Sequence, residues 1–397
     1  MKHRFFFLLF GLLSASTNSF CQQQLLLLNS DGTQSNYSLA FADEFNTDQL
    51  DRNKWMTSYP WGRHLTGSTS DQETLEYYTD GKNSPQKEGM ISLIAKKERT
   101  CGNCVSWEDS SKLNRNGELN YRCFDYSSGM IYSKEPYGYG YYEIRFKQAE
   151  NSKGLWPAFW LFGHDDEIDI FENKGERINE THWDLHCKGG CNKKYGGWKK
   201  LNTDFTKSFN TISFEWEPDK QKWFCNGINY ASKGQLYAEG MHIIANNAVS
   251  RDRKNKGFWV GTDATTVFPS ALDIDYIRYF KTHYTGRKWK YYVEDSELLK
   301  QLTTSNKTAF TNSSVKSKSS RLLAIYIDGK NHQLICDFNG NQKKQAVVSV
   351  YNSNGQLIKR QPLNQKNQII NQLPDETFII IARVGKKIMA ERVEVNR

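Results

Sequence analysis

Proline is scarce in this chain, long apolar runs are confined to its first residues, and no stretch shows a sustained helical period. Only eight of the 397 residues are proline, which excludes a collagen-like or proline-rich rod. After the N-terminus no run approaches the roughly 18 apolar residues that span a bilayer, so we expect no membrane span. Aromatic residues are abundant, with 11 Trp, 21 Tyr and 22 Phe. They favour strands and offer flat faces for ligand stacking.

Excess positive charge is also absent from most of the chain. The formal net charge is +9, but residues 282–397 alone hold 19 Lys and Arg against nine Asp and Glu. The remainder is therefore close to neutral. A nucleic-acid-binding domain would need a basic, aromatic-lined face on its fold, so we expect no nucleic-acid partner.

The N-terminus has the pattern of an export signal. Met1-Lys2-His3-Arg4 precedes a short apolar run, which small polar residues follow. The run is too short for a membrane anchor, and the pattern predicts a signal peptide over residues 1–21. Export makes disulfides plausible among the eight cysteines. Six of them lie between the leader and the tail and allow 15 pairings, which the sequence does not distinguish. They are Cys101, Cys104, Cys123, Cys187, Cys191 and Cys225.

The rest of the chain reads as two β-rich domains joined by a polar segment. Segments with partial period-2 patterning, such as 211–216 and 272–279, alternate with Gly, Asn and Asp clusters, which predicts an all-β domain over residues 22–281. Residues 282–321 are rich in Ser, Thr and Lys and read as a linker. Strand-like runs resume over 322–397 and predict a small second β-domain.

A cluster of acids carries the most chemistry. In Asp165-Asp166-Glu167-Ile168-Asp169-Ile170-Phe171-Glu172, charged residues alternate with apolar ones, which predicts a strand. Glu167 and Asp169 share a face, whereas Glu172 is five residues from Glu167 and would face the opposite side. A one-residue bulge would return Glu172 to the common face. Clustered carboxylates raise one another's pKa, and a pair with separated pKa values is what glycoside hydrolysis requires. A solvated acidic strand or a calcium loop remains the alternative.

Two indole rings precede the acidic cluster. Trp156 and Trp160 of Gly154-Leu-Trp-Pro-Ala-Phe-Trp160 are four residues apart and share a face if the segment is extended. Indole faces stack on sugar rings. Core packing is the competing interpretation for each Trp.

These motifs together resemble glycoside hydrolase family 16. The stretches that carry the resemblance are GLWPAFW, EIDIFE, FADEF at 41–45, YPWGR at 59–63 and DIDYIRY at 273–279. It covers about residues 39–281. The resemblance implies a jelly-roll β-sandwich with a concave substrate cleft, and retaining endo-hydrolases or transglycosylases of β-linked polysaccharides. The six-residue acidic motif resembles that of laminarinases, agarases, porphyranases and carrageenases.

The resemblance also implies residue roles. Glu167 would be the nucleophile and Glu172 the general acid/base. Asp169 would hydrogen-bond the nucleophile and help to set its protonation. Trp156 and Trp160 would line the subsite of the sugar under attack.

Further contacts follow from the same resemblance. His186, in a strand where His182 and Asp184 would share its face, is assigned to a leaving-side sugar, and Arg63 and Glu76 to the substrate cleft. Asp275 and Glu44 match the place of a structural calcium on the convex side, although a purely structural role fits them equally. No other cofactor is required.

The tail over 322–397 resembles the C-terminal sorting domain of the type IX secretion system. The matching stretches are VSVYNSNGQLI at 348–358, FIII at 378–381 and the basic pair at 386–387. This resemblance implies secretion or display at the cell surface through that machinery. A small carbohydrate-binding or adhesion module is the alternative.

We therefore expect a secreted, monomeric, retaining endo-β-glycanase that acts on a β-1,3-glucan of laminarin type. Red-algal galactans such as agar, porphyran or carrageenan are the second substrate class. A polysaccharide-binding lectin without catalysis and a transglycosylase are the remaining alternatives. An intact set of Glu167, Asp169 and Glu172 speaks against the lectin, because clustered carboxylates are costly to keep without a catalytic use.

Overall fold

The computed structural model is built from strands and turns, and none of the residues it describes lies in a helix long and apolar enough to cross a membrane. The described residues are 24–29, 34–64, 74–105, 111, 113, 119–187, 195–218, 220–234, 237, 239–252, 260–282, 321–328, 333–338, 346–364, 367–371, 373, 377–385 and 387–393. The predicted signal peptide, and all of the predicted linker except its two end residues, lie outside them.

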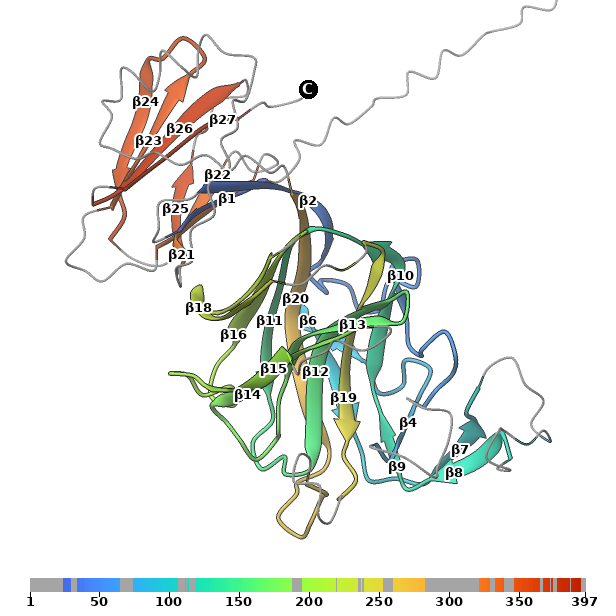
Figure 1. Ribbon diagram of the computed structural model, residues 1–397. Coiled ribbons are helices and arrows are strands. Elements are labelled where there is room, and N and C mark those ends of the chain that lie inside the picture. The colour runs from blue at the N-terminus through green and yellow to red at the C-terminus, as the bar shows by residue number, and fades with distance from the viewer. Residues whose placement is uncertain are drawn as a thin grey trace, which may run out of the picture.

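A twelve-stranded sheet runs the length of the molecule (Figure 1). In spatial order its path is β18 (Ile228–Lys233), β17 (Lys220–Cys225), β16 (Asn210–Glu217), β11 (Gly140–Gln148), β20 (Ser270–Thr282), β2 (Gln34–Asp43), β1 (Gln24–Asn29), β21 (Arg321–Asp328), β22 (Gln333–Phe338) and β25 (Gln368–Asn371). Two further strands join it beside β20, namely β6 (Met90–Ala95) and β5 (Gln86–Lys87).

A seven-stranded sheet packs against the part of this sheet that includes β16, β11 and β20. Its order is β15 (Tyr195–Lys200), β14 (Glu180–His186), β13 (Asp166–Glu172), β12 (Leu155–Gly163), β19 (Met241–Val249), β10 (Met130–Tyr137) and β3 (Trp55–Met56). All neighbouring pairs in it are antiparallel.

The main core lies between the two sheets, because alternate side chains of each strand turn inward. Tyr142, Ile144 and Phe146 of β11 belong to this core, together with Phe171 of β13. The rings of Phe146 and Phe171 stack with centroids 4.4 Å apart. The opposite faces of the two sheets are consequently free for polar side chains.

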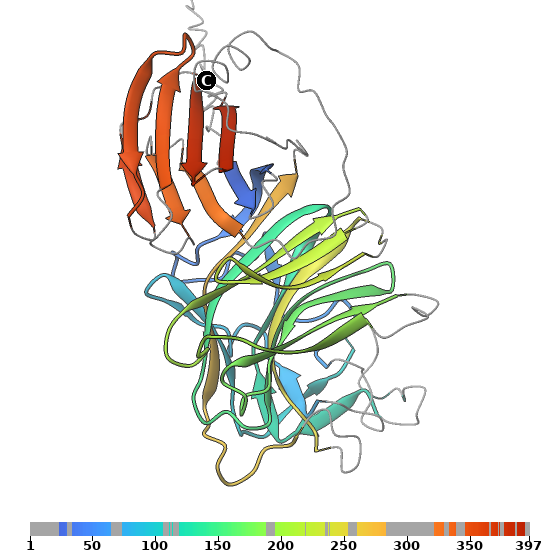
Figure 2. The ribbon, with the colours of Figure 1, turned by 60° about the vertical axis from the view of Figure 1, so that its left-hand side comes forward.

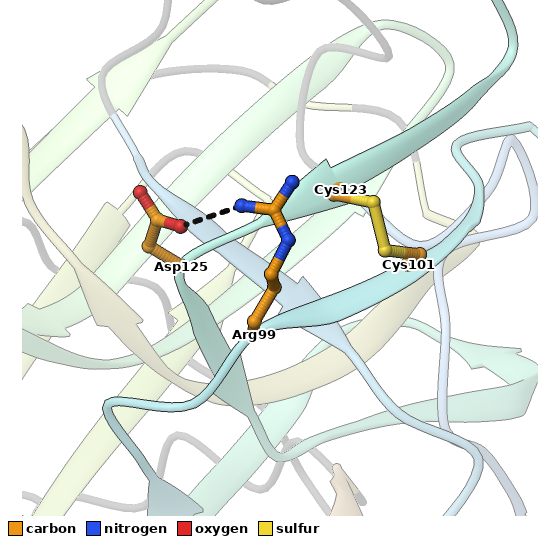
Figure 3. The surroundings of a disulfide bond; sticks show 4 residues. All are labelled: Arg99, Cys101, Cys123 and Asp125. Carbon is orange, nitrogen blue, oxygen red and sulfur yellow. Dashed lines mark ion pairs between the residues drawn. A yellow bond between two sulfur atoms is a disulfide. The ribbon is translucent and has the colours of Figure 1, made fainter.

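Short strands extend one end of the sandwich. They are β4 (Glu76–Tyr78) with β9 (Tyr126–Ser128), and β7 (Thr100–Asn103) with β8 (Tyr121–Phe124). Cys101 and Cys123 lie directly opposite each other on β7 and β8 and form a disulfide (Figure 3). The Arg99–Asp125 ion pair lies beside it at 3.5 Å. Among the described cysteines, Cys187 is also disulfide-bonded, and Cys104, Cys225 and Cys336 are buried.

A smaller β-sandwich forms the C-terminal part (Figure 2). One layer is the end of the large sheet, from β1 to β25. The other is a four-stranded sheet of β24 (Leu357–Pro362), β23 (Ala346–Asn352), β26 (Phe378–Val384) and β27 (Lys387–Val393). A separate apolar cluster fills the space between them and includes Leu26, Ile325, Val348 and Ile380. The predicted fold class, an all-β jelly-roll sandwich with a second small β-sandwich, is thereby confirmed.

The N-terminal strand belongs to both parts. Strand β1 pairs with β2 on one side and with β21 on the other. Leu26 faces the C-terminal core, whereas Leu25 and Leu27 pack with Tyr141 and Phe280 of the larger sandwich. The domain boundaries at 281 and 322 stay a prediction. Strand β1, which belongs to the first predicted domain, pairs with β21 of the second.

Candidate active site

The acidic strand is the second arm of a tight hairpin. Strands β12 and β13 are joined by His164 and Asp165, which both have positive φ values, of 57° and 63°. A two-residue turn with both central residues in this region matches the right-handed twist of the flanking strands. Asp and His tolerate it better than most residues. The turn therefore sets the register in which Glu167 lies opposite Phe162.

The bulge predicted from the odd spacing is present at Ile170. Asp169 lies opposite Trp160 while Phe171 lies opposite Phe159, so one residue of β13 has no counterpart on β12. Ile170 and Phe171 consequently both enter the core. Glu172 returns to the face of Glu167 and Asp169, because it lies opposite Ala158. Three carboxylates thus line the outer face of the seven-stranded sheet.

The three acids differ in exposure. The Glu167 side chain is 33% exposed, that of Glu172 13% and that of Asp169 3%. Burial is the main cause that raises the pKa of Asp169 well above its usual range, and the charges of Glu172 and Glu167 add to it. Asp169 can therefore hold a proton between two carboxylates.

Strand β14 supplies the next row of this face. His182 lies opposite Glu172, Asp184 opposite Asp169 and His186 opposite Glu167. The predicted common face of His182, Asp184 and His186 is thus observed, and it adjoins the carboxylates.

His186 is placed as a cation among the acids. Its Nε2 is 3.2 Å from Asp169 Oδ2, 3.6 Å from Glu167 Oε1 and 3.8 Å from Asp184 Oδ2. The hydrogen bond with Asp169 is the main cause that raises the pKa of His186 to about 10, and the neighbouring carboxylates contribute. His186 therefore keeps its proton across neutral pH beside these carboxylates.

The same three groups also form the one metal-like cluster among the described residues. One ligand atom each of Glu167, Asp169 and His186 lies within 4.8 Å of the others. An imidazole must be neutral to bind a metal ion, whereas the pKa of His186 is raised to about 10. The imidazolium occupies the place that a cation would take, so these groups fit a charge-balanced carboxylate site better than a metal centre.

Glu172 is held at both carboxylate oxygens. Trp156 Nε1 donates to Oε1 at 3.0 Å, and His182 Nδ1 lies 3.1 Å from Oε2. His182 is buried, and its ring lies 5.1 Å from that of Trp198 on β15. Two hydrogen-bonding partners from two strands thus fix the position of this carboxylate.

The two predicted sugar-contacting Trp residues are on the same face as the acids but retain little surface. Trp156 is 9% exposed and Trp160 7%. Trp160 Nε1 donates to Asn246 Oδ1 at 2.8 Å, and its ring packs against Tyr59 and Phe162. Both indoles therefore lie within the floor of the face and leave only an edge or part of a ring for a ligand. Their role in binding sugar stays a prediction.

Arg63 and Glu76 have hydrogen-bonding partners other than the three acids. Arg63 Nη1 donates to the Tyr78 carbonyl at 3.2 Å, and its side chain is 26% exposed. Glu76 is fully buried and accepts the backbone N–H of Val249 at 2.8 Å; burial raises its pKa. The burial of Glu76 argues against a direct contact with substrate, whereas Arg63 remains a candidate contact.

The two residues assigned to calcium are paired with arginines. Arg278 binds both Glu44 oxygens at 2.7 Å, and Arg145 pairs with Asp275. Bidentate guanidinium pairing uses the lone pairs that a calcium ion would need. These residues do not fit a calcium site in this conformation.

Sequence reasoning placed His182 on this face but missed its contact with Glu172, and it missed Trp198 and Asn246. His182, Trp198 and Asn246 come from β14, β15 and β19 and contact Glu172, His182 and Trp160 respectively. The only sequence signal for these contributors was the alternation of His182, Asp184 and His186, which places His182 on the same face as His186. Trp198 and Asn246 come from strands whose place beside the acids depends on sheet order.

The fold and the three carboxylates define the class. The arrangement is a β-sandwich with an acidic strand that bulges to present Glu167, Asp169 and Glu172 on one face, as the two-carboxylate chemistry of a glycoside hydrolase requires. Comparison with known families agrees. Residues 100–278 match the family described as "Glycosyl hydrolases family 16". This segment, somewhat less than half of the chain, is therefore similar to glycoside hydrolase family 16.

Individual relatives are more distant. The chain is 24% identical over 279 residues to "Glucan endo-1,3-beta-glucosidase A1" of Niallia circulans, which covers 62% of this chain and 38% of that protein. It is 25% identical over 230 residues to "Kappa-carrageenase" of Pseudoalteromonas carrageenovora, covering 50% and 56%. The chain thus spans less than two thirds of the length of both curated relatives.

A solved structure shows the same fold. The catalytic domain of an endo-1,3-β-glucanase (laminarinase) from Thermotoga petrophila matches with a TM-score of 0.51 at 27% identity. The match covers 63% of this chain and 99% of that domain. The similarity therefore concerns the larger sandwich rather than the whole chain.

Proposed function

We propose that the protein is a retaining endo-β-glycanase. The observation that carries the proposal is the bulge at Ile170, which brings two glutamates of different environment to one face with a buried aspartate between them. Retaining hydrolysis needs two carboxyl groups about 5–5.5 Å apart, one ionised and one protonated. Glu167, beside the His186 cation, suits the ionised role. Glu172, held by Trp156 and His182, suits the proton donor.

The chemistry follows in two displacements. Glu167 attacks the anomeric carbon while Glu172 gives its proton to the leaving glycosidic oxygen, so that a glycosyl ester forms and the bond to the leaving group breaks. Glu172 then takes a proton from water, which attacks the same carbon and releases Glu167. Glu167 loses its negative charge when the ester forms and regains it on hydrolysis. Asp169, which holds a proton next to Glu167, stabilises the charged form by a hydrogen bond.

The substrate we favour is a β-1,3-glucan of laminarin type. Support comes from the similarity to the N. circulans glucan endo-1,3-β-glucosidase and to the T. petrophila laminarinase domain. A red-algal galactan is the second candidate, and the similarity to κ-carrageenase favours it. The near-neutral charge of residues 1–281 speaks against a heavily sulphated ligand.

The test measures reducing-sugar release from laminarin, lichenan, agarose, porphyran and κ-carrageenan. The wild type is compared with Glu167→Gln, which keeps the side-chain shape and removes the nucleophile. We expect release from laminarin by the wild type and a loss of at least about 10⁴-fold in the variant. A rapid fall in viscosity would show attack on internal linkages, and the anomer formed first would show retention.

Asp165→Asn is the matched control, because it makes the same chemical change in the hairpin turn at an exposed position and Asn tolerates positive φ. Its activity should match the wild type. Binding without release from any substrate would favour the lectin. Longer oligosaccharides formed at high acceptor concentration would favour a transglycosylase. Equal release by wild type and Glu167→Gln would remove Glu167 from the mechanism.

We also propose that the protein is exported as a monomer and acts outside the cell or at its surface, with residues 322–397 as a type IX sorting domain. The Cys101–Cys123 disulfide supports an oxidising compartment. Fusion of residues 322–397 to a reporter protein in a bacterium with this secretion system tests the sorting role. Retention of the fusion in the periplasm would favour the carbohydrate-binding or adhesion module instead.

A further inference from the structure

A polar cavity lies on the side of the molecule opposite the acids. Its volume is about 460 Å³, within the range of small-molecule sites. Strands β11, β16 and β20 of the larger sandwich form one wall, and β21 and β22 of the C-terminal sandwich form the other. Figure 2 shows the C-terminal strands lying beside this end of the large sheet. The cavity is therefore created by the junction of the two sandwiches.

Strand alternation explains why its walls are polar. On β11, Tyr142, Ile144 and Phe146 enter the main core, so Glu143 and Arg145 face the cavity. On β22 the residues Leu334, Cys336 and Phe338 enter the C-terminal core. Ile335 and Asp337, between them, turn to the cavity instead. Two strands from different parts of the chain thus direct their non-core faces toward the same space.

A buried carboxylate anchors the junction. Glu143 is fully buried and accepts hydrogen bonds from the hydroxyls of Tyr141, Ser213, Tyr276 and Tyr326 at 2.9–3.0 Å. Tyr326 belongs to β21, so this contact joins the C-terminal sandwich to the larger one. Because a buried carboxylate is costly unless it is fully hydrogen-bonded, the contact holds the two walls in a defined position.

The charges of the lining nearly cancel. Three carboxylates, of Glu143, Asp275 and Asp337, face two guanidinium groups, of Arg145 and Arg278. Arg145 pairs with Asp275, and Arg278 lies 3.8 Å from the centre of the Tyr276 ring. The carboxylates would repel an anionic ligand, and the guanidinium groups would repel a cationic one. A neutral ligand therefore suits this lining best.

Two further features indicate a ligand rich in hydroxyl groups. Phe209, which is half-buried, presents aromatic surface to the cavity, on which the apolar face of a sugar ring can pack, whereas Phe280 is buried beneath it. Gln24, which also lines the cavity, has a buried Oε1 without a hydrogen-bond partner among the described residues. A sugar hydroxyl could donate the hydrogen bond that this carbonyl oxygen lacks.

We propose that this cavity is a second saccharide site that binds a short neutral oligosaccharide of about one to three hexose units, apart from the catalytic face. Carboxylates accept from vicinal hydroxyls, guanidinium groups donate to them, and Phe209 contacts a ring face. The proposal does not depend on which linkage the catalytic face cleaves. It assigns to the C-terminal sandwich a part in carbohydrate binding.

The test is isothermal titration of the full chain carrying Glu167→Gln with glucose, galactose, laminaribiose and laminaritriose. Binding at the cavity should appear as an event separate from binding at the catalytic face. Asp337→Ala removes an acceptor, and Ile335→Trp fills the space. Each should weaken the cavity event at least tenfold and leave the other event unchanged. In an otherwise wild-type chain, both variants should keep kcat/KM within about twofold.

Gln333→Ala is the matched control, because Gln333 has the same face parity on β22 as Asp337 but does not line the cavity. It should leave both events unchanged. A single event that neither cavity variant alters would overturn the proposal, as would binding that inorganic sulfate displaces. A single event that both cavity variants abolish would support the second site and count against the proposed function of the catalytic face.

Discussion

At the level of single residues, the site depends on the shifted pKa values of Asp169 and His186. Asp169 has a raised pKa because it is buried between two glutamates. His186 has a pKa raised to about 10, chiefly because it hydrogen-bonds Asp169. One proton is thus retained next to Glu167. The separate environments of the two glutamates allow one to act as nucleophile and the other as acid.

His186→Ala should shift the pH dependence of catalysis. Loss of a cation 3.6 Å from Glu167 disfavours the ionised nucleophile, so the acidic limb of the kcat/KM profile should move up by about one pH unit. In the intact protein, the stabilisation from this imidazolium is complete below pH 6.5 and is lost as the pH rises toward about 10. An unchanged acidic limb would contradict the placement of this charge.

His182→Ala should impair proton transfer more than binding. His182 Nδ1 is 3.1 Å from Glu172 Oε2, so its removal leaves the acid/base held only by Trp156. We expect kcat/KM to fall about tenfold to hundredfold on the polysaccharide. The loss should be smaller on an activated aryl glycoside, whose leaving group needs little protonation. His182→Asn, which keeps a donor near the Nδ1 position, should recover part of the activity. Equal losses on both substrates would indicate a purely structural role.

At the level of elements, the bulge in β13 decides which residues lie on the outer face of the sheet. It adds one residue between Asp169 and Glu172 and sends Ile170 and Phe171 to the core in succession. Without the bulge, the spacing from Glu167 to Glu172 would place the two glutamates on opposite faces. The hairpin turn at His164 and Asp165 determines where β13 starts, and the bulge determines which face of the sheet Glu172 lies on.

Deletion of Ile170 tests this explanation. The shortened strand would read Glu-Ile-Asp-Phe-Glu, in which regular alternation again puts the three acids on one face. We expect some hydrolysis to remain, with a stability loss of about 2–4 kcal/mol because a buried side chain is removed. Thermal unfolding and reducing-sugar release measure the two effects. Ile168→Ala is the control, since it removes core volume without altering the spacing. A folded deletion variant as inactive as Glu167→Gln would contradict the explanation.

At the level of the whole molecule, the N-terminal strand joins the two sandwiches. Leu25 and Leu27 pack on the larger sandwich and Leu26 on the C-terminal one, because neighbouring residues of a strand face opposite sides. Tyr326 and Glu143 add a buried polar contact. The C-terminal part is therefore packed against the hydrolase domain over these described residues.

Truncation after Thr282 should consequently destabilise the hydrolase domain. It would expose Leu26 and the edge of β1 that pairs with β21, and we expect a fall in Tm of several degrees and increased binding of an apolar dye. Leu26→Ala in the full chain, which opens only the C-terminal core, should cost about 2–4 kcal/mol. If the truncated chain kept the Tm of the full chain, the two parts would be energetically independent.

Much of the site could be predicted from the sequence, because it depends on short spacings. The alternation around Ile168, the odd offset of Glu172 and the pair of Trp residues lie within 17 residues of one another. The common face of Glu167 and Asp169 and the row of His182, Asp184 and His186 followed from period-2 geometry alone, and the same geometry identified a one-residue bulge as the condition for Glu172 to join them. The all-β class and a second β-rich part over 322–397 followed from the same reasoning.

Only the tertiary structure decided how distant segments meet. The burial of Glu76, the arginine partners of Glu44 and Asp275, the contact of His182 with Glu172 and the cavity beside Glu143 all depend on sheet order and on side-chain packing across strands. The shared role of β1 depends on a pairing with β21 that spans almost the whole chain. The sequence by itself determined the local direction of each side chain, because strand alternation is a property of neighbouring residues. It did not determine partners, because long-range pairing is selected by the burial of whole faces rather than by any short motif.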